Sequence, residues 1–475
     1  MTASRRLSVL QLHLRSTPAE PDVDSDAVRS GQLGRHACRA AAAAGPARPA
    51  SGPPVLVGGM VMDLQAHPSG PMDVQRGGSV PGRVTQSAGG VARNVAEGLA
   101  RLLLSDGGAP AALPLLVSAV GDDLAGAALL QHWRALGLST QCVAQLPGAP
   151  TPSVSVVFDL GGEVAACVAD MALLEGLPPV QLLGGAHVAA ALAACPILML
   201  DGNLPQATLE EACRQAAAAG VPIWFEPVSV PKSERAVALL PALAYISPNE
   251  KELAAMAAAA RRRQQQAQAG KQRGQGSGGG GGGGGGRSCC GGCAGCCCTA
   301  GRPAAARQPA AGSAAAAAAG SATATGATAA AAGAEAQLRS QLPDLATLLL
   351  AGVRHVVLTL GADGAALCSL SPGRDAVLVL HLPPLPARVV NCSGAGDCLV
   401  AGCLYGLTRG ATPAAALAHG VAAARAAVES GANVPPGLGA AAVRAGAAAA
   451  AARGTALRFA LPCSCGAGVQ AAPDC

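Results

Sequence analysis

The chain has 475 residues, half of them apolar but only seven aromatic, and it carries 33 lysines and arginines against 28 acidic residues. Eight of the basic residues and no acidic ones lie in residues 259–334, so the remainder has a small acidic excess. This balance, together with the scarcity of aromatic side chains, excludes a nucleic-acid binder that works by surface charge or base stacking. We also expect no membrane span, because the apolar runs are Ala-rich and interrupted by glycine. We expect no secretory signal, because the start of the chain has no charged segment followed by an apolar one.

Residues 1–52 are polar and rich in Arg, Pro and Ala, which predicts a targeting or disordered extension. Arg6-Leu7, followed after five residues by His13-Leu14, matches the type 2 peroxisomal targeting pattern. Helical spacing would bring these side chains toward one receptor-binding face. The sequence therefore favours the peroxisome, with an Arg-rich transit peptide for plastid or mitochondrion, or a cytosolic protein, as the alternatives.

Short β-branched runs alternate with Ala/Leu-rich stretches from residue 53 to about residue 258. This alternation predicts strand–helix units and a largely parallel sheet. The predicted strands are residues 55–61, 115–120, 153–159, 197–201 and 223–226, and the predicted helices are residues 94–104, 124–136 and 206–219.

Residues 259–334 consist of Gln/Arg, poly-Gly, Cys/Gly and poly-Ala runs, and we predict a disordered low-complexity insertion there. Six cysteines at residues 289–298 contain C-x-x-C spacings but lack a second, separated pair, so zinc is the weaker interpretation. The αβ pattern resumes at residue 335, with strands at 355–360 and 365–370 and a helix at 396–406. The predicted organisation is an extension (1–52), one core domain (53–258 and 335–440), the insertion (259–334) and an Ala-rich tail (441–475).

The most informative segment is Asn391-Cys-Ser-Gly-Ala-Gly-Asp397, which precedes an apolar helical run. A Gly-Ala-Gly turn that leads into a helix presents unpaired backbone N–H groups and the positive end of the helix dipole, which suits an anion. A carboxylate beside that site, Asp397, can accept the proton of an attacking hydroxyl during phosphoryl transfer. A glycine-rich turn capped by an aspartate is the alternative interpretation of this segment alone.

Two segments resemble signatures of the PfkB (ribokinase-like) sugar and nucleoside kinases. Asn391–Asp397 resembles the C-terminal signature, usually Asp-Thr-x-Gly-Ala-Gly-Asp, and Gly89-Gly-Val-Ala-Arg-Asn94 resembles the N-terminal one. The resemblance covers residues 55–438 apart from the insertion. It implies an ATP-dependent kinase with a three-layer α/β fold, in which helices flank a largely parallel sheet and a small β-strand lid covers the site. Asn391 and Cys392 depart from the family's Asp and Thr, but neither position supplies the base.

The resemblance also implies roles for individual residues, and it implies ATP, Mg²⁺ and in some members a monovalent cation as cofactors. For catalysis it implies Asp397 as the base and Gly394, Ala395 and Gly396 as the anion hole. For the substrate it implies Asp63, Gly89, Gly90 and Asn94, with a strand-ending turn as the alternative for Asp63. For the nucleotide it implies Thr359, Gly361, Gly364 and Asn433, and for magnesium and phosphates the Asn-x-x-Glu pair Asn249 and Glu252, which could otherwise be a helix N-terminus. The implied partners are a small-molecule substrate and a second copy of the chain, joined through the lid strands.

Several stretches resemble the pseudouridine-kinase subgroup, in which asparagine is expected at position 391. They are residues 89–97, 168–171, 201–204 and 225–229 with Lys232, and residues 390–391. The subgroup implies transfer to the 5′-hydroxyl of pseudouridine. Thr151, Ser153 and Asp170, on a predicted pair of lid strands, are candidates for contacts with the base edge, although ordinary polar lid residues would look the same. Another sugar or nucleoside kinase of the family is the alternative, followed by a non-catalytic nucleoside-binding protein.

Overall fold

The computed structural model of the protein describes residues 52–71, 78–161, 164–275 and 324–462. The predicted targeting motif and the cysteine run at residues 289–298 lie outside these residues. The chain divides into two compact units, one formed by Met1–Arg262 with Ala336–Cys475 and the other by Arg263–Glu335. All site residues discussed below belong to the first unit.

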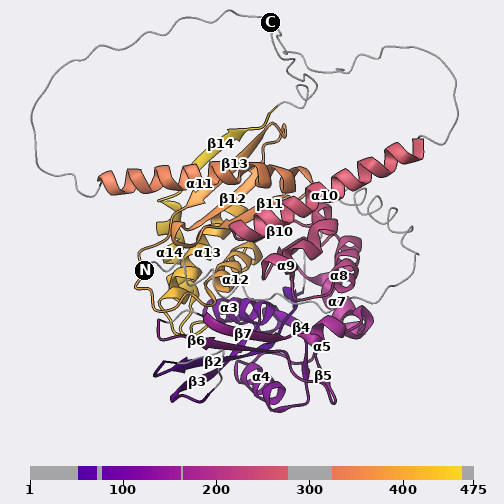
Figure 1. The fold of residues 1–475 in the computed structure, drawn as a ribbon, viewed down its shortest axis with the longest axis vertical. Coiled ribbons are helices and arrows are strands. Elements are labelled where there is room, and N and C mark those ends of the chain that lie inside the picture. Colours follow the sequence, from indigo (N-terminus) through magenta and orange to yellow (C-terminus); the bar gives the residue numbers. More distant parts are fainter. Residues whose placement is uncertain (1–51, 72–77, 162–163, 276–323, 463–475) are drawn as a thin grey trace, which may run out of the picture. The chain divides into compact units, whose positions relative to one another are not determined.

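A ten-stranded sheet forms the centre of the first unit, in the order β14-β13-β12-β11-β10-β9-β8-β1-β4-β5 (Figure 1). Seven neighbouring strands of this sheet are parallel, namely β11, β10, β9, β8, β1, β4 and β5. Strands β12, β13 and β14 continue the sheet beyond β11 in antiparallel pairing. Their bounds are β1 Val55–Val57, β4 Leu115–Gly121, β5 Val143–Leu146, β8 Leu198–Asp201, β9 Ile223–Glu226, β10 Tyr245–Ile246, β11 His355–Thr359, β12 Ala365–Leu370, β13 Ala376–Leu382 and β14 Thr455–Ala460.

Helices cover both faces of this sheet, because parallel strands need crossover connections and both of their faces are apolar. One face packs against α3 Val91–Ser105, α4 Leu124–Ala135, α12 Ala395–Thr408, α13 Pro413–Val428 and α14 Ala440–Ala451. The other face packs against α5 Ala172–Gly176, α6 Pro179–Leu183, α7 Ala186–Ala194, α8 Gln206–Ala219, α10 Glu250–Gln275 and α11 Ala324–Leu350. Short helical turns occur at α9 Val230–Ser233, Pro110–Ala112, Glu234–Ala242 and Gly361–Asp363. The predicted three-layer α/β fold is confirmed.

A second sheet of four strands forms the predicted lid, in the order β3-β2-β6-β7 (Figure 1, bottom). Its strands are β2 Val61–Pro68, β3 Gly82–Gly89, β6 Ser153–Phe158 and β7 Val164–Asp170. The single strand predicted at residues 55–61 is wrong, since β1 ends at Val57 and β2 begins at Val61 in a different sheet. The chain passes between the sheets at Gly58, where a Cβ atom would lie 2.3 Å from the Asp201 carboxyl carbon.

Two predicted boundaries differ from the elements of the structure. Helices α10 and α11 extend into residues 259–334, because their Ala, Gln and Arg residues favour helix. Residues of the predicted tail form α14 and β14, and β14 pairs with β13 along its whole length. Alanine-rich sequence conceals this strand, whose main apolar anchor is the buried Phe459.

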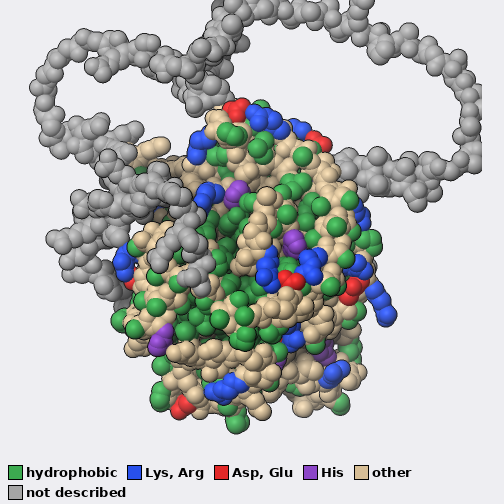
Figure 2. All heavy atoms as spheres, turned by 180° about the vertical axis from the view of Figure 1, so that it is seen from behind, with side chains coloured by type: hydrophobic (Ala, Val, Ile, Leu, Met, Phe, Trp, Pro, Cys, Tyr) green, Lys and Arg blue, Asp and Glu red, His purple; other side chains and the backbone are tan. Residues whose placement is uncertain are grey.

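The surface carries few charged side chains, as the composition predicts. On the face shown in Figure 2, basic side chains lie singly or beside acidic ones, separated by hydrophobic atoms. Asp106, for example, takes salt bridges from both Arg409 and Arg444. Among the described residues, no helix is long and apolar enough to cross a membrane.

Small residues let α12 and α13 approach closely. A Cβ atom on Gly402 of α12 would lie 2.5 Å from the His419 carbonyl oxygen, and one on Gly420 of α13 would lie 2.5 Å from the Cys403 sulfur. Such distances leave no room for a methyl group on either helix. This contact fixes α12, the helix that the Gly-Ala-Gly-Asp segment begins.

We expect Gly402→Ala to lower the free energy of unfolding by about 1–3 kcal/mol, the usual cost of overpacking. The protein should lose stability even though alanine has a helix propensity about 1 kcal/mol more favourable than that of glycine in a helix interior. Urea unfolding measures it, and Gly176→Ala at the end of α5 is a matched control, because nothing lies within 4 Å of its added methyl group. Equal stability of Gly402→Ala and the parent chain would contradict the close packing.

Candidate active site

The segment at residues 391–397 forms the N-terminus of α12, as its glycines require. Gly394 is the N-cap with φ of 76°, and a Cβ atom there would lie 1.9 Å from the Asn433 carbonyl oxygen. Only glycine fits this left-handed, crowded position. Ala395 and Gly396 are the first two helical residues, whose N–H groups have no partner within the helix, although the Ala395 N–H donates to the Cys392 carbonyl at 3.3 Å. The predicted anion hole therefore has the backbone geometry of an anion site.

Asp397 follows in the first turn of α12 and meets the other signature. The Asn94 side-chain amide donates a hydrogen bond of 2.7 Å to Asp397 Oδ2, although the two residues are 303 positions apart. Burial raises the pKa of Asp397 to about 7, against the opposing effects of the Asn94 hydrogen bond and the Arg93 charge. A carboxyl group with this pKa can hold or release a proton near neutral pH, which general base catalysis requires.

Asp63 lies on β2 of the lid, in contact with two other predicted site residues. The Asn433 side-chain amide donates to Asp63 Oδ2 at 3.2 Å, and a Cβ atom on Gly89 would lie 2.1 Å from the same oxygen. Burial raises the pKa of Asp63 to about 6, despite the Asn433 hydrogen bond and the Arg93 charge. Asn433 thus lies between Asp63 and the Gly394 turn, and the nucleotide contact that the resemblance implies for it stays a prediction.

Arg93 is a site residue that sequence analysis missed. It is buried and donates hydrogen bonds to the Ala88 carbonyl, to Asn94 Oδ1 and to Glu97. Burial alone would raise the pKa of Glu97, but hydrogen bonds from His132 and Arg101 and the Arg93 charge lower it to about 2. The guanidinium therefore orients the Asn94 carboxamide so that its nitrogen faces Asp397. A charged residue inside an apolar helix was the signal available in the sequence.

Asn249 and Glu252 form a capping box at the start of α10, the alternative that the sequence left open. Asn249 Oδ1 accepts from the Glu252 N–H at 3.0 Å, and Glu252 Oε2 accepts from the Asn249 N–H at 2.9 Å. Asn249 also forms a parallel bridge with Thr359, whose N–H donates to the Pro248 carbonyl at 3.0 Å. The predicted metal and nucleotide residues are thus neighbours at the carboxyl ends of β10 and β11.

A magnesium ion fits the carboxylates at this edge. Among the described residues, no cluster of three or more His, Cys, Asp or Glu side chains could hold a metal by itself. Mg²⁺ keeps most of its water and needs only one or two carboxylates. Burial, followed by the charges of Glu252 and Asp397, raises the pKa of Glu226 well above its usual value. A divalent cation would relieve this repulsion, so Glu226 and Glu252 are the side chains that suit it.

The predicted nucleotide turn follows β11. Gly361 and Gly364 have φ of 60° and 89°, and a Cβ atom on Gly364 would lie 2.2 Å from the Leu382 carbonyl oxygen. The turn thus requires glycine at Gly364 and lies at the same sheet edge as Asn249 and Thr359. Carboxyl ends of parallel strands are where α/β sheets bind ligands.

Thr151 is not free to contact a substrate in this structure. Its hydroxyl donates to Asp123 Oδ1 at 2.5 Å and accepts from the Gly121 N–H at 2.9 Å, and the residue is buried. Asp123 in turn caps α4. The base-edge role predicted for Thr151 is therefore replaced by a structural one.

Ser153 and Asp170 lie on the wrong face of the lid for the predicted base contact. Both are in register with Met62, whereas Asp63 is in register with Val154 of β6 and Ser87 of β3. Successive residues of a strand point to opposite faces. The face that carries Asp63 instead presents Gln65, Thr85 and Ser87.

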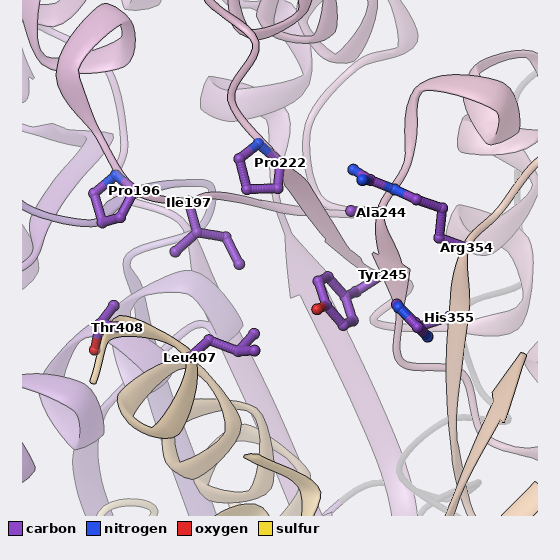
Figure 3. Close-up of a pocket in the computed structure, with 9 residues that line it drawn as sticks. All are labelled: Pro196, Ile197, Pro222, Ala244, Tyr245, Arg354, His355, Leu407 and Thr408. Carbon is purple, nitrogen blue, oxygen red and sulfur yellow. The ribbon is translucent and has the colours of Figure 1, made fainter. Parts of the chain in front are cut away.

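A separate cavity of about 200 Å³ lies at the amino ends of β8–β11, opposite to the edge that carries the predicted site (Figure 3). Figure 3 shows Tyr245 and His355 beside it, with Leu407 of α12 below. Tyr245 stacks between Trp224 and His355, with ring centroids 5.0 Å apart on each side. None of the predicted catalytic residues lines this cavity.

The raised pKa of Asp397 predicts how activity depends on pH. Below about pH 7 the carboxyl group is protonated and cannot accept a proton, so kcat/KM should fall about tenfold per pH unit on the acid side and level off above neutrality. Burial also raises the pKa of Glu252 to about 7. Glu252→Gln separates the two groups, because it removes the titration of Glu252 and leaves Asp397 in place. An acid limb that is absent from Glu252→Gln would contradict the role of Asp397.

The chain resembles known proteins over most of its length. Residues 55–277 and 309–436 match the pfkB family carbohydrate kinases. The chain is 30% identical over 419 residues to the pseudouridine kinase of Arabidopsis thaliana, covering 81% of this chain and 92% of that protein. It is 28% identical over 179 residues to the pseudouridine kinase of Escherichia coli, which covers 38% of this chain and 53% of that protein.

Solved structures show the same fold. Arabidopsis thaliana ribokinase complexed with ribose and ATP superimposes with a TM-score of 0.57 at 18% identity, covering 83% of this chain and 98% of that one. A Burkholderia thailandensis nucleoside kinase in complex with inosine gives a TM-score of 0.51 at 17% identity, covering 84% and 97%.

Proposed function

Because the chain belongs to the pfkB family of carbohydrate kinases and is thus an ATP-dependent kinase, we propose that its acceptor is the 5′-hydroxyl of pseudouridine. The observation that carries the reaction is the hydrogen bond between Asn94 and Asp397, which joins both signatures beside the N-terminus of α12. The similarity to the Arabidopsis pseudouridine kinase supports the acceptor.

The residues act as a base, an anion site and a substrate anchor. Asp397, held by Asn94, takes the proton of the attacking hydroxyl. The N–H groups of the turn at Gly394, Ala395 and Gly396 stabilise the charge that develops on the transferred group. ATP supplies the phosphoryl group. Glu226 and Glu252 would hold Mg²⁺, which would neutralise charge on the phosphates. Asp63 accepts hydrogen bonds from the ribose diol and so positions the sugar.

The lid face beside Asp63 supplies polar groups for the base. Gln65, Thr85 and Ser87 are partly buried or lie at the edge of the lid, and none has a side-chain hydrogen bond within the described residues. The Gln65 amide offers both a donor and an acceptor, which matches the alternating edge of a uracil ring. A buried polar group that only one base satisfies gives strong selectivity.

ATP consumption measured with pseudouridine, uridine, adenosine, ribose and fructose tests the proposal. We expect kcat/KM for pseudouridine to exceed that for every other acceptor by at least about tenfold. Gln65→Ala should reduce this preference, and the reduction should correspond to about 1 kcal/mol or more of transition-state binding free energy, the cost of a lost hydrogen bond. Preference for ribose or adenosine would assign another acceptor within the family. Absence of phosphorylation with the whole panel would leave a nucleoside-binding protein as the interpretation.

The outer face of the lid supports a homodimer. Val84 and Val168 are 68% and 70% exposed, and both lie on the face opposite to Asp63. Exposed apolar side chains on a sheet face favour burial against a partner. We expect a dimer in sedimentation equilibrium, and a monomer for the double variant Val84→Glu with Val168→Glu. A monomeric parent chain would refute this assembly.

The peroxisomal address remains our proposal, supported by Arg6-Leu7 and His13-Leu14. Residues 1–52 fused to a fluorescent protein should direct it to peroxisomes, and Arg6→Ala with His13→Ala should abolish this. Import into plastids or mitochondria would replace the proposal by a transit peptide.

A further inference from the structure

A fully buried carboxylate, Asp201, ends β8 close to the proposed substrate site. Its Oδ2 accepts hydrogen bonds from the N–H groups of Gly59 at 2.9 Å and Ala92 at 3.0 Å. Its Oδ1 accepts from the N–H of Asn203 at 3.0 Å, and the Asn203 side-chain amide also donates to Oδ2 at 3.2 Å. Four donors therefore converge on one side chain that the proposed reaction does not use.

Asp201 caps α3 from a distant part of the chain. The N-cap residue of α3 is Gly90, which has no side chain with which to cap, and Ala92 is the second residue of the helix. Capping side chains accept from the N–H at this position, and losing such a cap costs about 1 kcal/mol. The same oxygen binds Gly59 in the turn between β1 and β2. One carboxylate thus joins the start of α3 to the turn that leads into the lid.

Helix α9 and the turn that follows the neighbouring strand β9 hold Asp201 and its turn in place. Lys232 is 9% exposed, and its ammonium donates to Asn203 Oδ1 at 2.8 Å. A Cβ atom on Gly202 would lie 2.4 Å from the Pro227 carbonyl oxygen, so the two turns are tightly fitted. Only the Asn203 side-chain amide separates the Lys232 ammonium from the Asp201 carboxylate, and a buried negative charge requires a nearby positive charge or hydrogen-bond donors. Lys232, Asn203 and Asp201 form a continuous row of hydrogen bonds.

This row of hydrogen bonds ends close in sequence to Asn94 and Asp63, two residues of the proposed site. Ala92 is followed two residues later by Asn94, which binds the proposed base Asp397. Gly59 is followed four residues later by Asp63, the proposed anchor of the ribose. A shift of either segment would move the acceptor hydroxyl relative to Asp397, and displacements of about 1 Å can cost about 100-fold in rate.

We propose that Asp201, Asn203 and Lys232 are positioning residues that fix Asn94 and Asp63 relative to one another and so align the acceptor with the catalytic base. The inference rests on the proposed kinase site, but it assigns a function to side chains that do not touch the substrate.

Lys232→Met and Asn203→Leu test the row while preserving side-chain size. For whichever acceptor the parent chain phosphorylates, we expect kcat/KM to fall by about 10- to 100-fold. The KM for ATP should change less than about twofold, because the nucleotide turns at Thr359 and Gly364 lie on other strands. Lys232→Arg, which keeps the charge, should restore part of the loss. Leu209→Ala, which truncates a fully buried side chain of α8, is the control for general destabilisation.

Hydrogen exchange provides a second measurement that does not depend on catalysis. In Lys232→Met, the amides of residues 58–64 and 91–97 should exchange faster than in the parent chain, while those of α13 stay unchanged. Lower thermal stability with unchanged kinetics and unchanged local exchange would overturn the inference and leave a merely structural role. A parent chain without kinase activity would refute the proposed function, whereas the exchange difference would still be expected from the row.

Discussion

Asp397→Asn should reduce kcat by about 1,000-fold or more, the contribution of a well-placed general base combined with loss of its charge. The carboxamide has nearly the same shape and can still bond to Asn94, so α12 and the Gly394 turn should keep their geometry. Single-turnover kinetics at pH 8, where the parent carboxyl group is ionised, measures the effect.

Binding separates this catalytic loss from a folding defect. The dissociation constant of the nucleoside for Asp397→Asn, measured by calorimetry, should stay within about threefold of the parent value, since Asp63 and Asn433 are intact. A variant that turns over at near-parental rates would remove Asp397 from the mechanism.

Asp63→Asn should raise the KM for the nucleoside by about 100-fold. An ionised carboxylate gains about 1.5–3 kcal/mol for a hydrogen bond that it accepts, and the amide cannot accept from two hydroxyl groups with the same strength. The KM for ATP should change little, because Asp63 lies on the lid strand β2 and the nucleotide turn follows β11.

Asp170→Asn is the matched control, because it makes the same chemical change on the opposite face of the same lid. Its KM should remain within about twofold of the parent value. Equal effects of the two substitutions would mean that the lid register does not determine which side chains face the substrate.

The central sheet could be predicted because its strands are buried on both faces. The runs at residues 115–120 and 223–226 are short, apolar and bounded by helical stretches, and β4 and β9 occupy them with little change. Strand β14 could not be predicted, because the six residues of Thr455–Ala460 follow an alanine-rich helix and contain one buried aromatic side chain. Its place in the sheet depends on pairing with β13, which is a tertiary effect.

The backbone geometry at the start of α12 was predictable, whereas the identity of the lid side chains on the face of Asp63 was not. Glycines in a turn before a helix impose local geometry, so the turn at Gly394–Gly396 could be predicted from the amino-acid sequence. Contacts across the lid depend on register, and a shift of one residue exchanges its two faces. For this reason the sequence selected Ser153 and Asp170, whereas the face that carries Asp63 presents Gln65. Asp201 was also missed as a functional group, because its partners Gly59 and Ala92 are more than 100 positions away.

The stacked rings beside the cavity give the protein a built-in optical signal. Trp224, which stacks on Tyr245, and Trp133 of α4 are the two tryptophans of the chain, and both are fully buried. Their fluorescence in the folded state should be blue-shifted and should move to longer wavelength when the surrounding apolar layer opens to water. Because Trp224 precedes Glu226 by two residues on β9, Trp133→Phe would leave an emission that reports on the strand beside the proposed metal site, without any attached dye.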